Sequence, residues 1–222
     1  MYHFEKKFIF VHPQKCAGTS VRMVLRDEYN SYHGSPHEPQ CGILPNNHNL
    51  NSSYQPCSRI MKRWTSAHWT LKEWVDYIKR THNLTSFDIK EWFVFGVVRN
   101  PFDRVVSYYH HNLKNRPKFN LEFDEWVKTN LSQESFTKKQ NFLNMFEYDQ
   151  QFSCDYIIRQ DDIENGVRGL AERLNIRDYK LQHIKHNTER VEYDYRKFYN
   201  DETKQIVHDC FKDDIEHFGY GF

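Results

Sequence analysis

Short apolar runs alternate with longer polar stretches along the chain. Residues 7–12 and 92–98 are rich in β-branched and aromatic side chains and predict two buried strands, and residues 154–158 predict a third. The run at 92–98 is apolar throughout, which is typical of a strand at the centre of a parallel sheet. The segments between the strands carry apolar side chains at helical spacing. The pattern therefore predicts a doubly wound α/β domain.

Several of the predicted helices have recognisable beginnings. Thr70 is an N-cap residue with Glu73 three positions later, which is the pattern of a capping box. Pro101 lies at the first turn of another helix, where its missing N–H has no intrahelical partner to lose. The predicted helices cover residues 19–29, 71–80, 102–113, 122–130, 161–174 and 200–217.

One long stretch has a different composition. Residues 30–60 are polar and rich in Pro, Asn, Ser and His, which predicts a long loop or insertion of the kind that can close over a substrate. Residues 61–67 predict a short strand that leads to His68. Because a length of 222 residues suits one α/β unit, we expect residues 1–222 to form a single domain with this insertion.

Composition narrows the class of protein. The formal net charge is +1, which argues against an extended nucleic-acid-binding surface. Charged residues make up 27% of the chain and the mean hydropathy is -0.88. No stretch approaches the ~20 apolar residues that cross a bilayer. The sequence therefore predicts a soluble protein with no nucleic-acid partner and no membrane span.

The five cysteines are widely scattered. None forms a C-x-x-C pair and no other metal-ligand spacing is present, so we expect no metal site. Cys154 and Cys210 lie in apolar patterns and are expected to be reduced core thiols. Cys41 and Cys57 flank one polar loop, where a disulfide and two reduced thiols are both compatible with the sequence.

The segment Phe8–Ser20, FIFVHPQKCAGTS, combines an apolar strand, a turn with a lysine and the start of a helix. Gly18 permits close approach of the backbone, Thr19 and Ser20 supply hydroxyls, and a helix N-terminus presents N–H groups to an anion. A Walker A loop has its lysine directly after its last glycine, as G-x-x-x-x-G-K-[ST]. Here Lys15 precedes the glycine by three positions. A phosphate-like ligand is therefore expected, and ordinary ATP chemistry is not the first expectation.

A second phosphate-binding pattern follows the central strand. Arg99 lies at the carboxyl end of this strand, the edge at which open α/β sheets bind ligands. Ser107 follows near two turns into the next helix, from where its hydroxyl can come back beside the arginine. The two side chains can then hold one phosphate by charge and hydrogen bonding. The alternative is that Arg99 pairs with an internal carboxylate and that Ser107 lies on the surface.

These segments resemble those of a known enzyme family. The Lys15 loop is similar to the 5′-phosphosulfate loop of sulfotransferases that use 3′-phosphoadenosine 5′-phosphosulfate (PAPS). The R-x-x-x-x-x-x-x-S spacing of Arg99 and Ser107 resembles their 3′-phosphate-binding segment. Residues 66–71, SAHWTL, resemble the segment with the catalytic histidine in the carbohydrate group that contains the heparan sulfate 2-O- and 6-O-sulfotransferases. Two later segments resemble that family's strand–helix unit and its final helix, residues 158–162 and 214–220.

The resemblance implies a P-loop NTPase-like fold and an O-sulfotransferase that moves the sulfuryl group of PAPS to a carbohydrate hydroxyl without a metal. Lys15 would neutralise charge on the transferred group, and His68 would be the general base, because histidine titrates near neutral pH. Arg99 and Ser107 would hold the 3′-phosphate. The residues expected to contact PAPS are Lys15, Cys16, Ala17, Gly18, Thr19, Ser20, Arg99, Ser107, Lys185 and Thr188. The last two come from a stretch that matches a family loop able to close over the nucleotide.

Other readings of the sequence stay open. One is a P-loop nucleotide kinase or NTPase with an aberrant loop, against which the missing Walker A pattern counts. Another is a non-catalytic relative that binds a glycan or a nucleotide. His68 is one of 13 histidines, most of which are expected to be structural or exposed. Its position before a capped helix, together with the resemblance, favours it as the base.

The N-terminus enters the first predicted strand without the pattern of a signal peptide. We therefore expect a cytoplasmic protein, as in a bacterial or viral enzyme, if the sequence is complete. If it is a truncated piece, the Golgi lumen is the expected compartment.

Overall fold

The computed structural model describes residues 1–32, 68–116, 120–131, 141–181 and 194–222. Several predictions fall on other residues and so lie outside the described ranges. They are most of the insertion at 30–60, the strand at 61–67, the redox states of Cys41 and Cys57, and the nucleotide contacts of Lys185 and Thr188. Residues 30–32, predicted as the start of the insertion, instead belong to a helix.

A four-stranded sheet in the order β1-β2-β3-β6 lies at the centre of the described chain. Its strands are β1 (Tyr2–His3), β2 (Phe8–Val11), β3 (Phe93–Val98) and β6 (Tyr156–Arg159). The strands β2, β3 and β6 are parallel, and β3 lies between the other two, as its apolar sequence predicts. The antiparallel β1 is not among the predicted strands, because two residues are too few to show a pattern.

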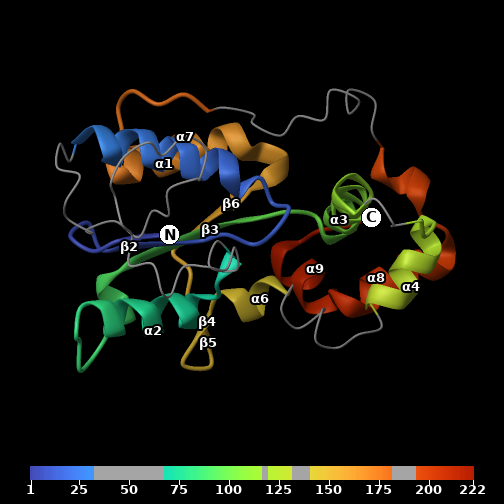
Figure 1. The fold of residues 1–222 in the computed structure, drawn as a ribbon, viewed down its shortest axis with the longest axis horizontal. Coiled ribbons are helices and arrows are strands. Elements are labelled where there is room, and N and C mark those ends of the chain that lie inside the picture. Colours follow the sequence, from blue (N-terminus) through green and yellow to red (C-terminus); the bar gives the residue numbers. More distant parts are fainter. Residues whose placement is uncertain (33–67, 117–119, 132–140, 182–193) are drawn as a thin grey trace.

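Helices cover both faces of the sheet (Figure 1). The helices α1 (Gly18–Tyr32) and α7 (Ile163–Leu174) lie on one face, and α2 (Leu71–Thr81) lies on the other. The residues that α2 buries have helical spacing: Leu71, Trp74, Val75 and Ile78. The predicted capping box is confirmed, since Thr70 and Glu73 bind each other's backbone N–H groups. The chain is thus a mixed α/β domain with a mostly parallel sheet flanked by helices, as predicted.

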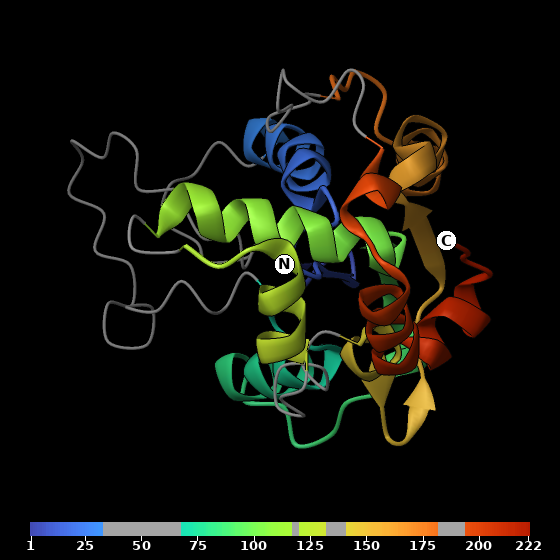
Figure 2. The same cartoon turned by 90° about the vertical axis from the view of Figure 1, so that its right-hand side faces the viewer.

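A second group of helices packs beside the carboxyl ends of the strands (Figures 1 and 2). It includes α3 (Pro101–Asn115), which follows β3 directly, and α4 (Phe123–Leu131). Apolar side chains of this group form a core cluster of their own, which includes Phe102, Trp126 and Phe211. Because α3 begins at the sheet edge and runs into this cluster, it connects the two parts of the core.

The prediction of one helix over residues 200–217 is wrong. The structure has two helices there, α8 (Asp201–Cys210) and α9 (Lys212–Phe218). Phe211 between them has φ -123° and ψ 24° and is buried in the second cluster. The direction of α9 brings Asp214 against the first turn of a short helix, α6 (Phe142–Met145), where it accepts two backbone N–H groups. Tertiary contacts thus override the continuous helical pattern.

The remaining described elements are short. They are the hairpin strands β4 (Glu147–Tyr148) and β5 (Gln151–Phe152) and the 3₁₀ helices η2 (Ile89–Glu91), η3 (Gln160–Asp162) and η5 (Tyr195–Phe198).

Cys154 and Cys210 are unbridged, as predicted, and so is Cys16. Burial raises the pKa of the Cys154 thiol to about 12, so this side chain stays protonated at neutral pH.

Candidate active site

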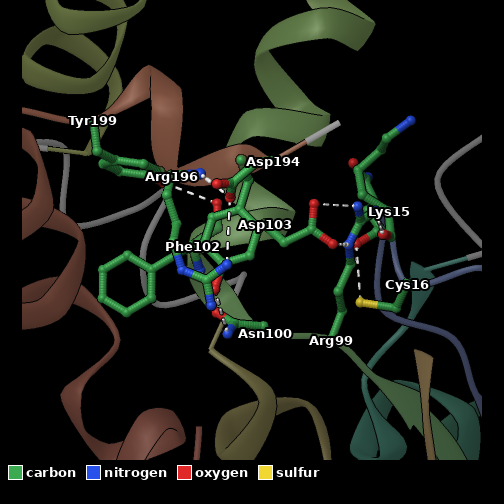
Figure 3. Close-up of polar contacts among 11 residues, drawn as sticks. Lys15, Cys16, Arg99, Asn100, Phe102, Asp103, Asp194, Arg196 and Tyr199 are labelled. Carbon is green, nitrogen blue, oxygen red and sulfur yellow. Dashed lines mark hydrogen bonds and ion pairs between the residues drawn. The ribbon is translucent and has the colours of Figure 1, made fainter. Parts of the chain in front are cut away.

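The parallel strands bring the candidate residues to one edge of the sheet. Their carboxyl ends share this edge, so the segment that follows β2 lies next to the segment that follows β3. The two segments are in direct contact, because the Nη1 group of Arg99 donates a hydrogen bond of 2.8 Å to the carbonyl oxygen of Lys15 (Figure 3). Arg99 and the Lys15 loop, which lie far apart in the sequence, therefore form one site.

The loop between β2 and α1 has the backbone conformation of an anion cradle. Lys15 and Ala17 both have left-handed φ angles, 64° and 60°. Alternation between left- and right-handed residues turns successive N–H groups toward one point, as in phosphate-binding nests. The Ser20 N–H, however, donates to the Ala17 carbonyl oxygen at 2.9 Å. This N–H is therefore engaged within the first turn of the helix, and the predicted contact of Ser20 with a ligand stays a prediction.

A glycine is needed at position 18 because the neighbouring His12 ring leaves no room for a Cβ atom, and not because of an unusual φ angle. A Cβ atom at position 18 would lie 2.7 Å from Cγ of His12, and closer still to Cδ2 and Nε2. The His12 ring is buried and stacks parallel to the ring of Phe10, with centroids 5.7 Å apart. The end of β2 thus packs tightly against the first turn of α1.

Arg99 is buried, with 4% of its surface exposed, and is paired with Asp103. Its Nε and Nη2 atoms each lie 2.6 Å from a carboxylate oxygen of Asp103, which makes the pair bidentate (Figure 3). The internal carboxylate that the sequence left as an alternative is therefore present. In the described contacts, Arg99 binds Asp103 and Lys15 and does not bind Ser107.

Ser107 does not lie on the surface, because only 8% of it is exposed. It follows Asp103 by four residues on α3, so the two side chains lie on the same helical face one turn apart. Ser107 is therefore one turn beyond the carboxylate that binds Arg99.

Gln14 is held by two α3 side chains that the sequence analysis missed. The Nε group of Arg104 donates to the Gln14 carbonyl oxygen at 2.9 Å, and the Tyr108 hydroxyl donates to Gln14 Oε1 at 2.9 Å. Arg104 is 2% exposed, which is rare for an arginine unless it is paired. Their spacing of four residues was the available signal, since it places both on one face of the helix.

His68 lies beside this loop. Its Nδ1 atom is 2.9 Å from the carbonyl oxygen of His12, and the two imidazole rings meet edge to face with centroids 4.7 Å apart. His68 is partly exposed and comes two residues before Thr70, the N-cap of α2. The capped helix thus positions the histidine at the start of the candidate anion loop.

The side chain of Cys16 points into the protein and not toward a ligand. It is fully buried, and its thiol donates to the Gln14 carbonyl oxygen at 3.4 Å. Burial raises the pKa of this thiol, against the opposing effects of Arg104 and Arg99. Cys16 can therefore contribute its backbone N–H to an anion site but not its sulfur.

A buried carboxylate lies behind the loop. Burial raises the pKa of Asp214 to about 6, although its hydrogen bonds from the N–H groups of Phe142 and Leu143 and the charge of Arg104 oppose this shift. The ring of Phe142 in turn lies under the Arg104 guanidinium, 4.4 Å from its centroid. Asp214 thus fixes the aromatic support of the arginine that holds Gln14.

Two features are absent from the described residues. These residues contain no group of three or more His, Cys, Asp or Glu side chains arranged to hold a metal ion. Within the same ranges, none of the helices has the length and apolar character needed to cross a membrane.

A family model described as "Sulfotransferase family" matches residues 2–221, almost the whole chain. The chain belongs to the sulfotransferase family. It is therefore a transferase that moves sulfuryl groups, and the loop, Arg99 and His68 of this sulfotransferase lie at one edge of its sheet. No curated protein matches the chain, and no solved structure matches it.

Proposed function

We propose that this sulfotransferase transfers the sulfuryl group of PAPS to a hydroxyl of a carbohydrate acceptor, with His68 as the general base. The observation that carries the proposal is the hydrogen bond between His68 and the His12 carbonyl oxygen. It joins the one histidine singled out by its sequence context to the loop that resembles a phosphosulfate-binding loop. A base and an anion site in contact are what a transfer from a phosphosulfate to a hydroxyl requires.

The loop fits the 5′-phosphosulfate. Its left-handed residues Lys15 and Ala17 form a nest, and the N-terminus of α1 adds a favourable dipole. Lys15 supplies a positive charge, while Gly18 and Thr19 complete the turn into the helix. The parallel strands and this β2–loop–α1 unit also support a P-loop-like fold for a single domain.

Arg99 and Ser107 are proposed to hold the 3′-phosphate. The contacts of Arg99 with Asp103 and Lys15 use three of the five N–H groups of a guanidinium, which leaves one on each terminal nitrogen. Asp103 balances the charge of the arginine and fixes its plane. Ser107 lies one turn further along the same helical face. Lys185 and Thr188, outside the described residues, are proposed as further contacts with the nucleotide.

The tautomer of the neutral His68 ring follows from its hydrogen-bond partner. A carbonyl oxygen can only accept, so Nδ1 carries the proton in the neutral ring and Nε2 carries the lone pair. His68 can therefore take the proton of the acceptor hydroxyl at Nε2. As the acceptor oxygen forms a bond to sulfur, the bond between sulfur and the phosphate oxygen of the donor breaks, and Lys15 neutralises the charge that develops there. The resemblance of the histidine segment supports a carbohydrate as the acceptor.

The first test is binding of adenosine 3′,5′-bisphosphate (PAP), the desulfated product, measured by calorimetry. Binding of PAP in preference to ATP is expected, because only PAP carries a 3′-phosphate. Absence of PAP binding, or magnesium-dependent turnover of ATP, would overturn the proposal.

The second test is a screen of carbohydrate acceptors with labelled PAPS, followed by substitution of the base. His68→Ala should retain PAP binding and lose transfer, by about 10²–10⁴-fold for a general base. His208→Ala is the matched control, because His208 is also partly exposed, lies on α8 and pairs with Asp209. Unchanged transfer in His68→Ala would remove the histidine from the mechanism.

A further inference from the structure

The carbonyl groups of two successive loop residues, Gln14 and Lys15, point toward α3 and the segment that leads into it. The carbonyl oxygen of Gln14 accepts from Arg104, and that of Lys15 accepts from Arg99. The side-chain oxygen of Gln14 accepts from Tyr108, one turn after Arg104. Three oxygens of these two residues are therefore bound by two side chains of α3 and by Arg99, two residues before the helix begins.

Because a peptide unit is planar, the direction of each carbonyl group also sets the direction of the next N–H group. The C=O and N–H of a trans peptide point in opposite directions, and no cis bond occurs among the described residues. When the Gln14 and Lys15 carbonyls turn toward two buried guanidinium groups, the N–H groups of Lys15 and Cys16 turn the other way. An anion is repelled by carbonyl oxygens and attracted by N–H groups, so the orientation of these two peptides decides whether the loop binds it.

We propose that Arg104 and Tyr108 are positioning residues that hold Gln14 so that the N–H groups of Lys15 and Cys16 face the anionic donor. This inference rests on the proposed function, because it takes the loop as the donor site. Neither side chain touches the ligand in this scheme. Arg104 sets the peptide plane after Gln14, and Tyr108 keeps the Gln14 side chain from moving away.

The surroundings of both side chains support a fixed arrangement. Arg104 is 2% exposed, and its guanidinium lies over the rings of Phe142 and Tyr108, 4.4 Å and 5.7 Å from their centroids. Asp214 fixes the backbone at Phe142, so the aromatic support is itself held. Burial raises the pKa of the Tyr108 phenol, which therefore remains a donor at any working pH.

The test uses the mildest available change, Tyr108→Phe, which removes one hydroxyl and keeps the ring beneath Arg104. Tyr109→Phe is the matched control. Tyr109 is the next residue on α3, is buried to the same extent, and donates its hydroxyl to the Leu121 carbonyl oxygen, away from the loop. Both variants lose one tyrosine hydroxyl and keep the ring, so a loss of stability from the chemical change itself would affect them alike.

The first readout is hydrogen exchange of residues 12–20 in the protein without ligand, measured by mass spectrometry. Faster exchange in Tyr108→Phe than in Tyr109→Phe is expected, because only the first variant releases Gln14. Equal exchange in the two variants would overturn the inference, whatever the ligand of the loop proves to be.

The second readout is PAP affinity by calorimetry. One neutral hydrogen bond corresponds to about a 5- to 10-fold weaker affinity in Tyr108→Phe, with Tyr109→Phe equal to the wild-type protein. In steady-state assays, the KM for PAPS should rise while kcat changes little. Normal PAP affinity in Tyr108→Phe would refute the positioning role and leave the proposed function standing. A wild-type protein that binds no PAP would refute the donor site, and the exchange result alone would then decide whether α3 holds the loop.

Discussion

The contact between Gly18 and His12 predicts an energetic coupling that can be measured. In Gly18→Ala the new Cβ would lie 2.7 Å from Cγ of His12, well inside van der Waals contact, with two other ring atoms closer. The His12 ring cannot swing away without losing its stacking on Phe10 and its edge contact with His68. Overpacking of this kind costs about 1–3 kcal/mol. We expect Gly18→Ala to lower the free energy of unfolding by that amount.

The same substitution should be tolerated once the ring is removed. In a His12→Ala background the three ring atoms nearest to the new Cβ are gone, and alanine in place of glycine in α1 contributes up to about 1 kcal/mol through helix propensity. Gly18→Ala should then be neutral or stabilising. The hydrogen bond from His68 survives in this background, because it goes to the backbone of residue 12.

A double-mutant cycle in urea gives the coupling free energy between the two positions, expected to be about 1–3 kcal/mol. The free-energy contributions of other His12 contacts cancel in the cycle. Gly221→Ala is the control for the chemical change itself, since a Cβ at that position meets nothing within 4 Å. A coupling below about 0.5 kcal/mol would show that the loop relaxes freely and that the close packing of β2 on α1 is not a constraint.

Two further predictions concern the buried charges around the loop. Asp103→Ala leaves the Arg99 guanidinium buried without its bidentate partner, so the free energy of unfolding should fall by about 3 kcal/mol in urea denaturation; an unchanged value would contradict the pairing. Asp214 has a pKa of about 6 in the folded protein, above the ordinary value of 3.8, so its contribution to stability is fully present below pH 3.8 and is lost as the pH rises through 6. The unfolding free energy of the wild-type protein minus that of Asp214→Asn should therefore decrease by about 2 kcal/mol from pH 4 to pH 7, and a difference that stays constant with pH would refute this.

The elements that the sequence predicted well are those whose signals are local. The parallel strands β2 and β3 are apolar runs that have to be buried, and α2 begins at a capping box whose two residues interact with each other. The break at Phe211 has no such signal, because it depends on a cluster to which distant helices contribute. The strand β1 depends in the same way on pairing with β2.

The candidate site also contains residues that sequence motifs predict and residues whose roles depend on tertiary contacts. Sequence spacing placed Lys15, Arg99 and His68 in motifs, and the parallel sheet brings two of these motifs together at one edge. The sequence offered an internal carboxylate as a possible partner of Arg99, but it did not identify this carboxylate as Asp103. The hydrogen bonds from α3 to Gln14 were not predicted, because the sequence of a helix does not show which loop will pack against it.

The amino-acid sequence was sufficient to predict an α/β sulfotransferase with a displaced lysine in its Lys15 loop, because strands, caps and turns are specified by residues near one another. The orientation of that loop, in contrast, depends on contacts between distant parts of the chain. Its carbonyl oxygens are bound by Arg99 and Arg104, about 84 and 90 residues further along the chain, and no local rule couples peptide planes over that distance. The direction of two N–H groups, on which the proposed binding of an anion depends, follows from packing against α3.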